Sequence, residues 1–399
     1  GHSQVTERAS SMKLVKPKHK SEIVPHDLPD VIPEEITEND AQRFFSIIST
    51  ELTPGQIRQV LSPEKSYPRQ QGVMALHWHP EFVPMELIAQ RINATFPNRK
   101  QELIIPTQHN VLMSYGEYSG VEVDCYSRGF NRKVQLLLHF EKSRLDRAGI
   151  LKAQLAHTRN YRASQLFDFI HTITTPVEER LDEAAGETGA DAELVGFVRI
   201  YVRKLNELLD RHMDQVPPDA IKNKLLRDFF ETMRPDYGDM VINRAQAFLK
   251  AVKEIVKRNF SPKYFYRTSE IIEEARALGA GVVIPHPEQF WPILLADYDV
   301  DGYEVWNPQS REYTEFLITV LNRKNREAGL SKRRLLVFMG DDTHMSEKTK
   351  PPQERDHLKA SREIGVQPPW SDLIIRKKLV VAHMDKHEVM AEYRARLAG

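Results

Sequence analysis

The chain has 399 residues, of which 56 are Lys or Arg and 56 are Asp or Glu, so its formal net charge is zero. This length allows one large domain with additions or two to three ordinary domains, and a hydrophobic content of 41% supplies a sizeable core. Zero net charge excludes an overall basic field that would attract nucleic acid or an acidic membrane, but it does not exclude a local basic patch.

Cysteine content and hydropathy indicate the compartment. Cys125 is the only cysteine, which excludes an intrachain disulfide framework and fits a reducing environment. The sequence has no run of 18 apolar residues that would predict a transmembrane helix and no apolar stretch typical of a signal peptide. We therefore expect a cytoplasmic protein without a membrane partner, and the sequence leaves its oligomeric state open.

Two N-terminal segments precede the main domain. Residues 1–35 are polar and contain several prolines and a cluster of lysines, which predicts a flexible arm. Residues 36–66 carry two helical patterns. The first begins at Thr37, and the second begins at Thr53-Pro54, where a threonine N-cap precedes a proline at the first helical position. We expect the two helices to form a cap on the main domain.

Residues 67–145 and 260–345 contain seven short apolar runs that predict β-strands. Several runs are continuously apolar, as in parallel strands that are covered on both faces. Helical patterns lie between some of the runs, which indicates an α/β fold, either a parallel barrel or an open sheet. In such barrels the active site lies at the carboxyl ends of the strands. The predicted strands are Gly72–Leu76, Glu102–Pro106, Gly120–Asp124, Lys133–Phe140, Gly279–Pro285, Gly302–Trp306 and Leu335–Met339.

A helical region interrupts this alternation at residues 146–259. Its strongest pattern, Asp191–Met213, places leucine, valine and aromatic residues at helical spacing, which is typical of an amphipathic helix. We expect an insertion beside the barrel that acts as a lid, a dimerisation surface or a spacer. Residues 346–399 follow the last strand. Ser346–Pro369 is rich in Lys, Pro and Glu and predicts a long mobile loop, and Met384–Leu397 predicts a final helix.

The sequence His77-Trp78-His79-Pro80 follows the first predicted strand. Residues i and i+2 of a strand point to the same side, so both imidazoles can face one point. Neutral imidazole is the commonest side-chain metal ligand. A single His-x-His pair is weak support for a metal site, but similar residues recur near the ends of other predicted strands.

Histidines and carboxylates lie in or after all seven predicted strands. If the strands form a barrel, these residues converge on one mouth. Mixed imidazole and carboxylate ligands are typical of Zn²⁺, Mn²⁺ and Fe²⁺ sites, and two ions about 3.5–4 Å apart suit attack on a phosphoester. The residues concerned are His77, His79, His109, Glu122, His139, His286, Glu304, Asp342 and His344.

These motifs resemble the PHP superfamily, the polymerase and histidinol phosphatase domain. The family's His-x-His motif matches His77-Trp78-His79, and its Gly-Val-Glu motif matches Gly120-Val121-Glu122. Its Thr-Asp-His-Asn motif appears as Thr107–Asn110 with Gln108 in place of Asp. Its His-Pro motif is His286-Pro287, and its Gly-Ser-Asp-x-His motif appears as Gly340–His344. The motifs occur in the family's order and cover residues 70–140 and 260–345.

The resemblance implies a distorted (β/α)7 TIM-like barrel that holds two or three divalent metal ions, Zn, Mn or Fe. By it, one ion is held by His77, His79, Glu122 and Asp342, and a second by Glu122, His139 and His286. His109 and His344 belong to a third site. The family's further His or Asp ligand of that third site is missing from Pro80–Glu86, where Glu81 or Glu86 can substitute.

We therefore expect a metal-dependent phosphoesterase in which a hydroxide bridging two ions attacks phosphorus. Glu122 and Asp342 are the expected catalytic residues. Arg128 and Arg132, after the third strand, are candidate phosphate ligands, as are Lys348 and Lys350 after the seventh. Glu304 is either a partner of a ligand histidine or an unrelated acid at the end of a strand.

Three alternatives stay open. The expected substrate is a small phosphorylated molecule or a nucleotide, but the basic arm and the lysines after His344 also allow a nuclease or nucleic-acid-processing factor. The second alternative is a non-catalytic binding module, in which metal ions only stabilise the barrel. An amide substrate also fits, because a metal-activated hydroxide attacks either kind of centre.

Overall fold

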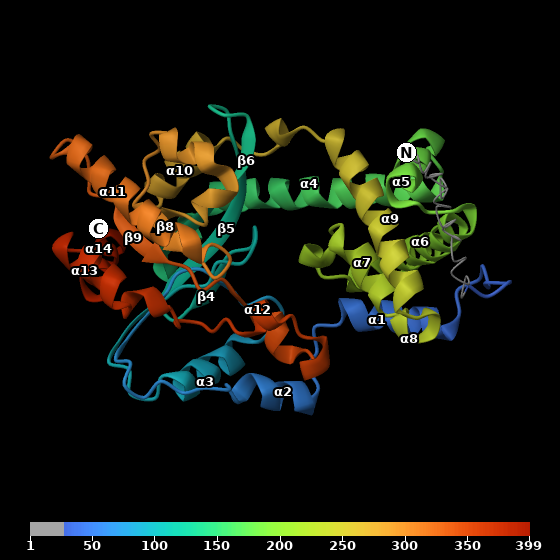
Figure 1. The fold of residues 1–399 in the computed structure, drawn as a ribbon, viewed down its shortest axis with the longest axis horizontal. Helices are drawn as coiled ribbons and strands as arrows, with labels where there is room; N and C mark the ends of the chain where they lie inside the picture. Colours follow the sequence, from blue (N-terminus) through green and yellow to red (C-terminus); the bar gives the residue numbers. More distant parts are fainter. Residues whose placement is uncertain (1–27) are drawn as a thin grey trace, which may run out of the picture.

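The computed structural model describes residues 28–399, so most of the expected polar arm lies outside the described residues. An α/β part and the C-terminal helices occupy one side of the molecule, and a group of helices occupies the other (Figure 1). The long helix α4 (Gly149–Thr174) runs between these two parts.

Each of the seven predicted strand segments contains a strand. The main sheet has six strands in the order β4-β5-β6-β7-β8-β9, with bounds Met113–Tyr115, Tyr118–Ser127, Arg132–Glu141, Gly281–Ile284, Gly302–Trp306 and Leu336–Met339. Two pairs of parallel strands form separate two-stranded sheets. β1 (Gly72–Ala75) pairs with β3 (Gln101–Ile104), and the short β2 (Trp78–His79) pairs with β10 (Thr343–His344).

The expectation of parallel strands is wrong for part of the sheet. β5 and β6, of ten residues each, form an antiparallel hairpin, and β6 is also antiparallel to β7. In contrast, β7, β8 and β9 are parallel to one another. The reason is the short connection between β5 and β6, because antiparallel strands can be joined by a tight turn whereas parallel strands need a long crossover. The carboxyl end of β6 therefore lies beside the beginning of β7.

Helices cover the sheet where the 3.6-residue patterns predict them. α10 (Thr268–Ala277) and α11 (Thr314–Ala328) pack against the strands, and α14 (Lys386–Ala398) contacts β1, β6, β7 and β9. Apolar side chains of these elements form one buried cluster with the sheet. The remaining helices of the α/β part are α3 (Met85–Thr95), α12 (His357–Ala360) and α13 (Leu373–Val381).

The helical insertion has a core of its own. It consists of the second half of α4 together with α5 (Glu178–Thr188), α6 (Ala192–His212), α7 (Lys224–Glu231), α8 (Arg234–Tyr237) and α9 (Asp239–Arg258). In α4, Leu151 and Leu155 belong to the core of the sheet, whereas Phe169 and Ile173 belong to the core of the insertion. Because α4 contributes to both cores, the insertion is packed onto the sheet.

The two N-terminal helices pack on different parts of the molecule. α1 (Glu38–Ile48) contributes Phe44 and Ile48 to the core of the insertion, whereas α2 (Pro54–Leu61) packs on α3 and on the segment after β10. The expected N-cap at Thr53 is present, because its side chain accepts a hydrogen bond from the Gln56 N–H.

A buried ion pair joins α1 to α6. Lys204 Nζ lies 2.7 Å from Asp40 Oδ2, and both side chains are 1% exposed. Burial opposes ionisation of Asp40, but the hydrogen bond from Lys204 lowers the pKa of this carboxyl group below its ordinary value. The pair joins α1 to the insertion together with a second ion pair, between Arg43 of α1 and Asp236 of α8.

Breaking this pair should be costly for folding. We expect Lys204→Met to lower the free energy of unfolding by about 1–3 kcal/mol, because it removes a charged hydrogen bond from a buried carboxylate that keeps only Arg43 as an ion-pair partner. Thermal and denaturant unfolding measure the loss. The double variant Asp40→Leu/Lys204→Met should be more stable than Lys204→Met alone. A double variant that is less stable than either single variant would contradict this explanation.

The segment after β10 is not the mobile loop expected from its composition. It forms short helical turns, and Lys348, Arg362 and Gln367 are buried within it. Lys348 donates hydrogen bonds to the carbonyl oxygens of Ala360 and Arg362, so it is held in the fold and is not a free phosphate ligand. A composition rich in polar residues predicted mobility, but here the polar side chains form hydrogen bonds with each other and with the backbone, which fixes the segment.

Within residues 28–399, no helix combines the length and the apolarity that crossing a bilayer requires.

Candidate metal centre

Local backbone structure brings the expected ligands together from distant parts of the sequence. His79 and His344 are paired residues in the parallel β2–β10 ladder, and His109 forms an isolated bridge with Glu122 of β5. The Asp342 N–H donates to the His77 carbonyl oxygen, which joins the end of β9 to the end of β1. Seven of the eight expected metal ligands therefore meet in one region.

The first group consists of two histidines and two carboxylates. His77 Nε2 lies 2.8 Å from Glu122 Oε2 and 3.2 Å from Asp342 Oδ1. His79 Nε2 lies 3.0 Å from the same Asp342 atom and 3.5 Å from the same Glu122 atom. His77, His79, Glu122 and Asp342 are all buried. Four donor atoms thus surround one point.

The second group shares residues with the first. His77, Glu122 and His286 each offer a ligand atom within 4.8 Å of the others. His286 Nδ1 is buried and has no hydrogen-bond partner among the described residues. The backbone at His286 and Asp342 has positive φ values of 27° and 52°, which non-glycine residues rarely adopt and which cluster at functional sites.

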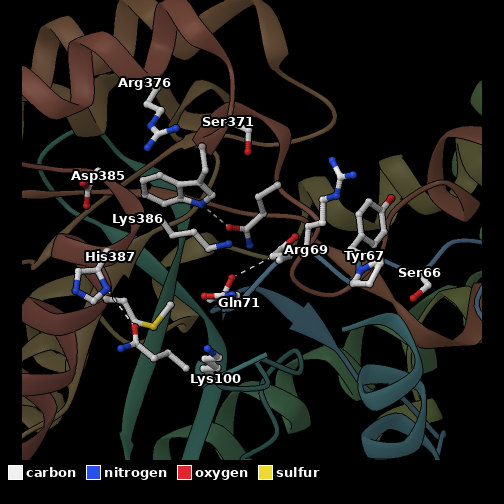
Figure 2. A pocket seen from close by; sticks show the side chains of 17 residues that line it. Ser66, Tyr67, Arg69, Gln71, Lys100, Ser371, Arg376, Asp385, Lys386 and His387 are labelled. Carbon is white, nitrogen blue, oxygen red and sulfur yellow. Dashed lines mark hydrogen bonds between the residues drawn. The ribbon is translucent and has the colours of Figure 1, made fainter. Parts of the chain in front are cut away.

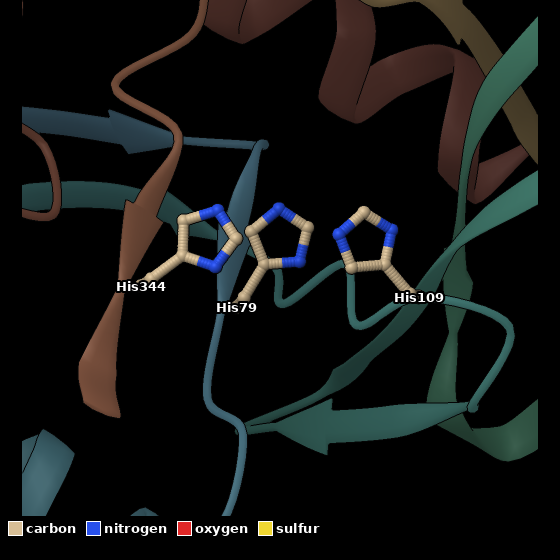
Figure 3. Close-up of side chains that lie close together, drawn as sticks. All are labelled: His79, His109 and His344. Atoms are coloured by element: carbon tan, nitrogen blue, oxygen red, sulfur yellow. The ribbon is translucent and has the colours of Figure 1, made fainter. Parts of the chain in front are cut away.

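The third group is a row of imidazoles. The His79 ring stacks on His109 at a centroid distance of 4.4 Å and on His344 at 4.2 Å (Figure 3). Their ligand atoms lie within 4.8 Å of one another. Glu81 Oε1 lies 3.6 Å from His344 Nδ1. Of the two acids expected to replace the missing ligand, Glu81 is thus beside the group.

Glu122 connects all three groups. Its Oε2 faces His77 and His79, while its Oε1 lies 3.4 Å from His109 Nδ1. A carboxylate whose two oxygens face different sets of imidazoles has the arrangement of a bridging ligand. This placement follows from the pairing of β5 with the residues after β3, because the Glu122 N–H donates to the Gln108 carbonyl oxygen.

The electrostatics favour a cation at this position. Burial opposes protonation of His77, but the carboxylates of Asp342, Glu304 and Glu122 raise its pKa well above the usual value. Burial and the neighbouring His109 and His344 lower the pKa of His79 to about 3, so its imidazole is neutral at pH 7, as metal binding requires.

Further side chains hold the ligands in place. His77 Nδ1 lies 2.7 Å from Glu304 Oε2, the contact by which a carboxylate orients a metal-binding imidazole. Asn307 Nδ2 donates to both Glu304 and Asp342. Arg362, a residue that the sequence did not single out, donates to the Asp342 carbonyl oxygen at 3.1 Å. Arg362 lies twenty positions after Asp342, outside every motif, so no sequence pattern predicted this contact.

The donor set fits a divalent metal ion. Bonds of about 2.0–2.2 Å place neighbouring donor atoms about 2.8–3.6 Å apart, from octahedral to tetrahedral geometry. The four distances of the first group, from 2.8 to 3.5 Å, cover nearly the same range. Imidazole combined with carboxylate is the chemistry of Zn, Mn and Fe sites. Three overlapping groups of the described residues could therefore hold metal ions.

His139 lies outside these groups. Its Nδ1 bonds to the Tyr393 hydroxyl and its Nε2 to the Leu76 carbonyl oxygen, both at 2.7 Å. The antiparallel direction of β6 explains this position, because it pairs His139 with Gly120 and Gly281, at the beginnings of β5 and β7. A histidine at the end of a parallel strand would instead face the other ligands.

Arg128 and Arg132 are also distant from the three groups. Both are exposed at the tip of the β5–β6 hairpin, and Arg128 lines a cavity whose lining includes none of the seven clustered ligands. The strand before Arg128 continues to Ser127, beyond the predicted end at Asp124, and this extension carries both arginines away from Glu122.

Another cavity, of about 860 Å³, lies where β1 and β3 begin, at the opposite end of these strands from His77 (Figure 2). Side chains from four segments surround it, among them Arg69, Lys100, Arg376 and Lys386. It contains none of the candidate metal ligands. We therefore place the candidate functional site at the histidine and carboxylate groups.

The pKa of His344 gives a testable pH dependence. Burial opposes its protonation, but the carboxylates of Asp342 and Glu81, 3.5 and 3.6 Å from its ring nitrogens, raise the pKa to about 9. In metal-free protein this histidine should stabilise the fold fully below pH 6.5, and the contribution should disappear as the pH rises to about 9. Thermal unfolding with a chelator measures it as the difference between the parent and His344→Gln. That difference should shrink across this window, and a constant or growing difference would contradict the assignment.

Comparisons with known proteins add little to this picture. No family model matches the sequence, and no curated protein matches it. One solved structure from Bifidobacterium adolescentis, described as a "putative metal-dependent phosphoesterase", is 17% identical and aligns over 79% of this chain and 97% of its own, with a TM-score of 0.40. At this identity and TM-score, the likeness assigns neither a fold family nor an activity.

Proposed function

We propose that this protein is a metal-dependent hydrolase, a phosphoesterase of PHP type that uses two or three divalent ions of Zn, Mn or Fe. The observation that carries the proposal is the position of Glu122. Its two oxygens face the imidazoles of adjoining groups, with Asp342 completing the first of them. A bridging carboxylate between histidine-rich sites is suited to holding ions close together.

Each residue then has a defined task. His77, His79 and Asp342 hold one ion with Glu122, and His286 with Glu122 holds a second. His109 and His344, with Glu81 beside them, form the third position. When bound, such ions lower the pKa of water and stabilise charge on phosphoryl oxygens. Glu304 and Arg362 keep His77 and Asp342 in position.

The proposal includes the barrel. β1 and β3 share the buried cluster of the main sheet. Backbone hydrogen bonds join the residues after β3 to Glu122 of β5, and Asp342 after β9 to His77 after β1. These contacts support a ring of strands in which the two smaller pairs complete the six-stranded sheet as a distorted barrel.

The test is reconstitution of metal-free protein with Mn²⁺, Zn²⁺ or Fe²⁺, followed by assays on phosphomonoesters, phosphodiesters and amides. We expect hydrolysis of phosphoesters that depends on metal and is absent after chelation. Metal binding that raises the unfolding temperature without any turnover would favour the non-catalytic binding module. Turnover restricted to amides would contradict the choice of phosphorus as the reacting centre.

A further inference from the structure

A second feature lies beside the metal centre. A cavity of about 310 Å³ opens between the sheet and the helical insertion, and Gln108, His109 and Asn110 form part of its wall. The side of the cavity formed by β6 and α4 carries Lys133, Arg159 and Arg162. Because His109 also belongs to the third metal group, the cavity and the metal centre share a wall.

The helical insertion adds four more cations. Lys222 reaches the cavity from the segment before α7, Lys224 from the first residue of α7, and Lys253 and Lys257 from α9. The acidic side chains of the lining are Asp124 and Asp219. Seven cations therefore face two carboxylates, although the whole chain has no net charge.

Ion pairs neutralise only some of these cations. Asp124 lies 3.4 Å from Lys133 and 2.7 Å from Arg162, and Lys253 lies 3.8 Å from Glu254. The other four have no ion pair with a carboxylate within residues 28–399. They are Arg159, Lys222, Lys224 and Lys257.

Crowding of these cations has an energetic cost. Burial and the nearby Lys224 lower the pKa of Lys222, although the carboxylates of Asp219, Glu81 and Asp228 act in the opposite direction. Burial and the charges of Lys253 and Arg162 lower the pKa of Lys257, although Glu254 opposes the shift. Lysines that lose water and lie near other cations are stabilised by a bound anion.

The position of His109 links this cavity to the reaction. Its side chain is 39% exposed, and its Nδ1 is 3.4 Å from Glu122. A ligand with one phosphate at the metal ions can therefore pass His109 and place a second anionic group among the lysines. Arg159 is held for such a contact, because it lies on α4 and donates to the Asn110 carbonyl oxygen.

We propose that this cavity is a subsite for a second phosphate group, so that the substrate is a small molecule bearing two phosphate groups. The inference rests on the proposed function for the first phosphate. The volume of about 310 Å³ is at the lower end of the range for small-molecule pockets, which favours a compact ligand over a polymer. The insertion thereby acts as a specificity element.

Binding to metal-loaded, full-length protein tests the subsite without turnover. The probes are alkane bisphosphonates of increasing chain length and alkyl monophosphonates of matched length, titrated by calorimetry. We expect at least one bisphosphonate to bind about tenfold or more tightly than its matched monophosphonate, because the lysines add charge-assisted contacts. Equal affinity throughout the series would overturn the proposal.

The variant Lys222→Met/Lys257→Met should abolish that preference. Methionine keeps an apolar stem of similar length and removes the charge. The control is Arg128→Met, which removes an exposed cation outside the cavity and should leave the preference unchanged. Loss of the preference in Arg128→Met, or its retention in the double variant, would overturn the proposal.

Thermal unfolding checks that the double variant folds. In metal-free protein its unfolding temperature should be higher than that of the parent, because two partly buried charges that other cations of the cavity repel are gone. A lower unfolding temperature would contradict the crowding of charge on which the subsite depends.

Two further outcomes distinguish the proposed subsite from the proposed phosphoesterase function and from a nucleic-acid substrate. Protein that prefers bisphosphonates through Lys222 and Lys257 but hydrolyses no ester would support the subsite and refute the phosphoesterase function. The other outcome concerns oligothymidylates. If their affinity rises with every added nucleotide and the double variant weakens their binding, the cavity belongs to a binding groove for a nucleic-acid chain, and the proposal of a small-molecule substrate is overturned.

Discussion

Glu122→Gln should reduce metal-dependent hydrolysis at least about a thousandfold, equivalent to about 4 kcal/mol of transition-state stabilisation. Glutamine has nearly the same shape but no charge, and its amide group would face the imidazoles of His77 or His109. Because both oxygens of Glu122 face groups that could hold ions, one substitution affects all three positions. Steady-state kinetics at saturating metal measures the loss.

A matched control for this variant is Glu102→Gln. Glu102 is 42% exposed, pairs with Arg99 at the edge of β3 and touches none of the candidate ligands. Its variant should retain parental activity. If Glu122→Gln were as active as Glu102→Gln, the bridging role of Glu122 would be wrong.

Glu304→Gln should weaken metal binding by about tenfold to a hundredfold, as is usual when a carboxylate behind a ligand histidine is removed. Glu304 Oε2 accepts from His77 Nδ1 and thereby orients Nε2 toward Glu122 and Asp342. We expect the metal concentration for half-maximal activity to rise, with maximal activity largely restored by excess metal. A defect in folding alone would lower the activity at every metal concentration, and excess metal would not restore it.

Gly340→Ala offers an independent route to the same site. A Cβ at Gly340 would lie 1.9 Å from Glu304 Oε2, so the carboxylate has to move. This change alters no charge, yet it should raise the metal requirement in the same direction as Glu304→Gln. Unchanged metal dependence in both variants would show that Glu304 does not position His77.

The sequence predicted which candidate ligands lie together better than it predicted their surroundings. His77 and His79 follow a strand, and His286 and Asp342 follow parallel strands, so alternation and strand direction were enough to bring them together. The same reasoning placed His139 with them, because the sequence did not reveal that β6 runs antiparallel to its neighbours. Strand direction depends on long-range pairing, which local patterns do not encode.

Tertiary contacts also explain the other differences. Arg128 and Arg132 were expected near the ligands, but they lie at the exposed tip of the β5–β6 hairpin. Arg362 lies in a segment whose composition indicated mobility, and its contact with Asp342 joins residues twenty positions apart through a folded chain. The lysines at α7 and α9 are remote from His109 in the sequence, and only the fold brings them into the lining of the same cavity.

Metal content is the most direct test of the account. Protein purified without a metal-affinity step is analysed for Zn, Mn and Fe, together with Asp342→Asn. We predict two or more equivalents of metal in the parent and a clear decrease in the variant, because Asp342 Oδ1 lies within 3.2 Å of both His77 and His79. Substoichiometric metal that Asp342→Asn does not change would contradict the metal centre and the proposed function with it.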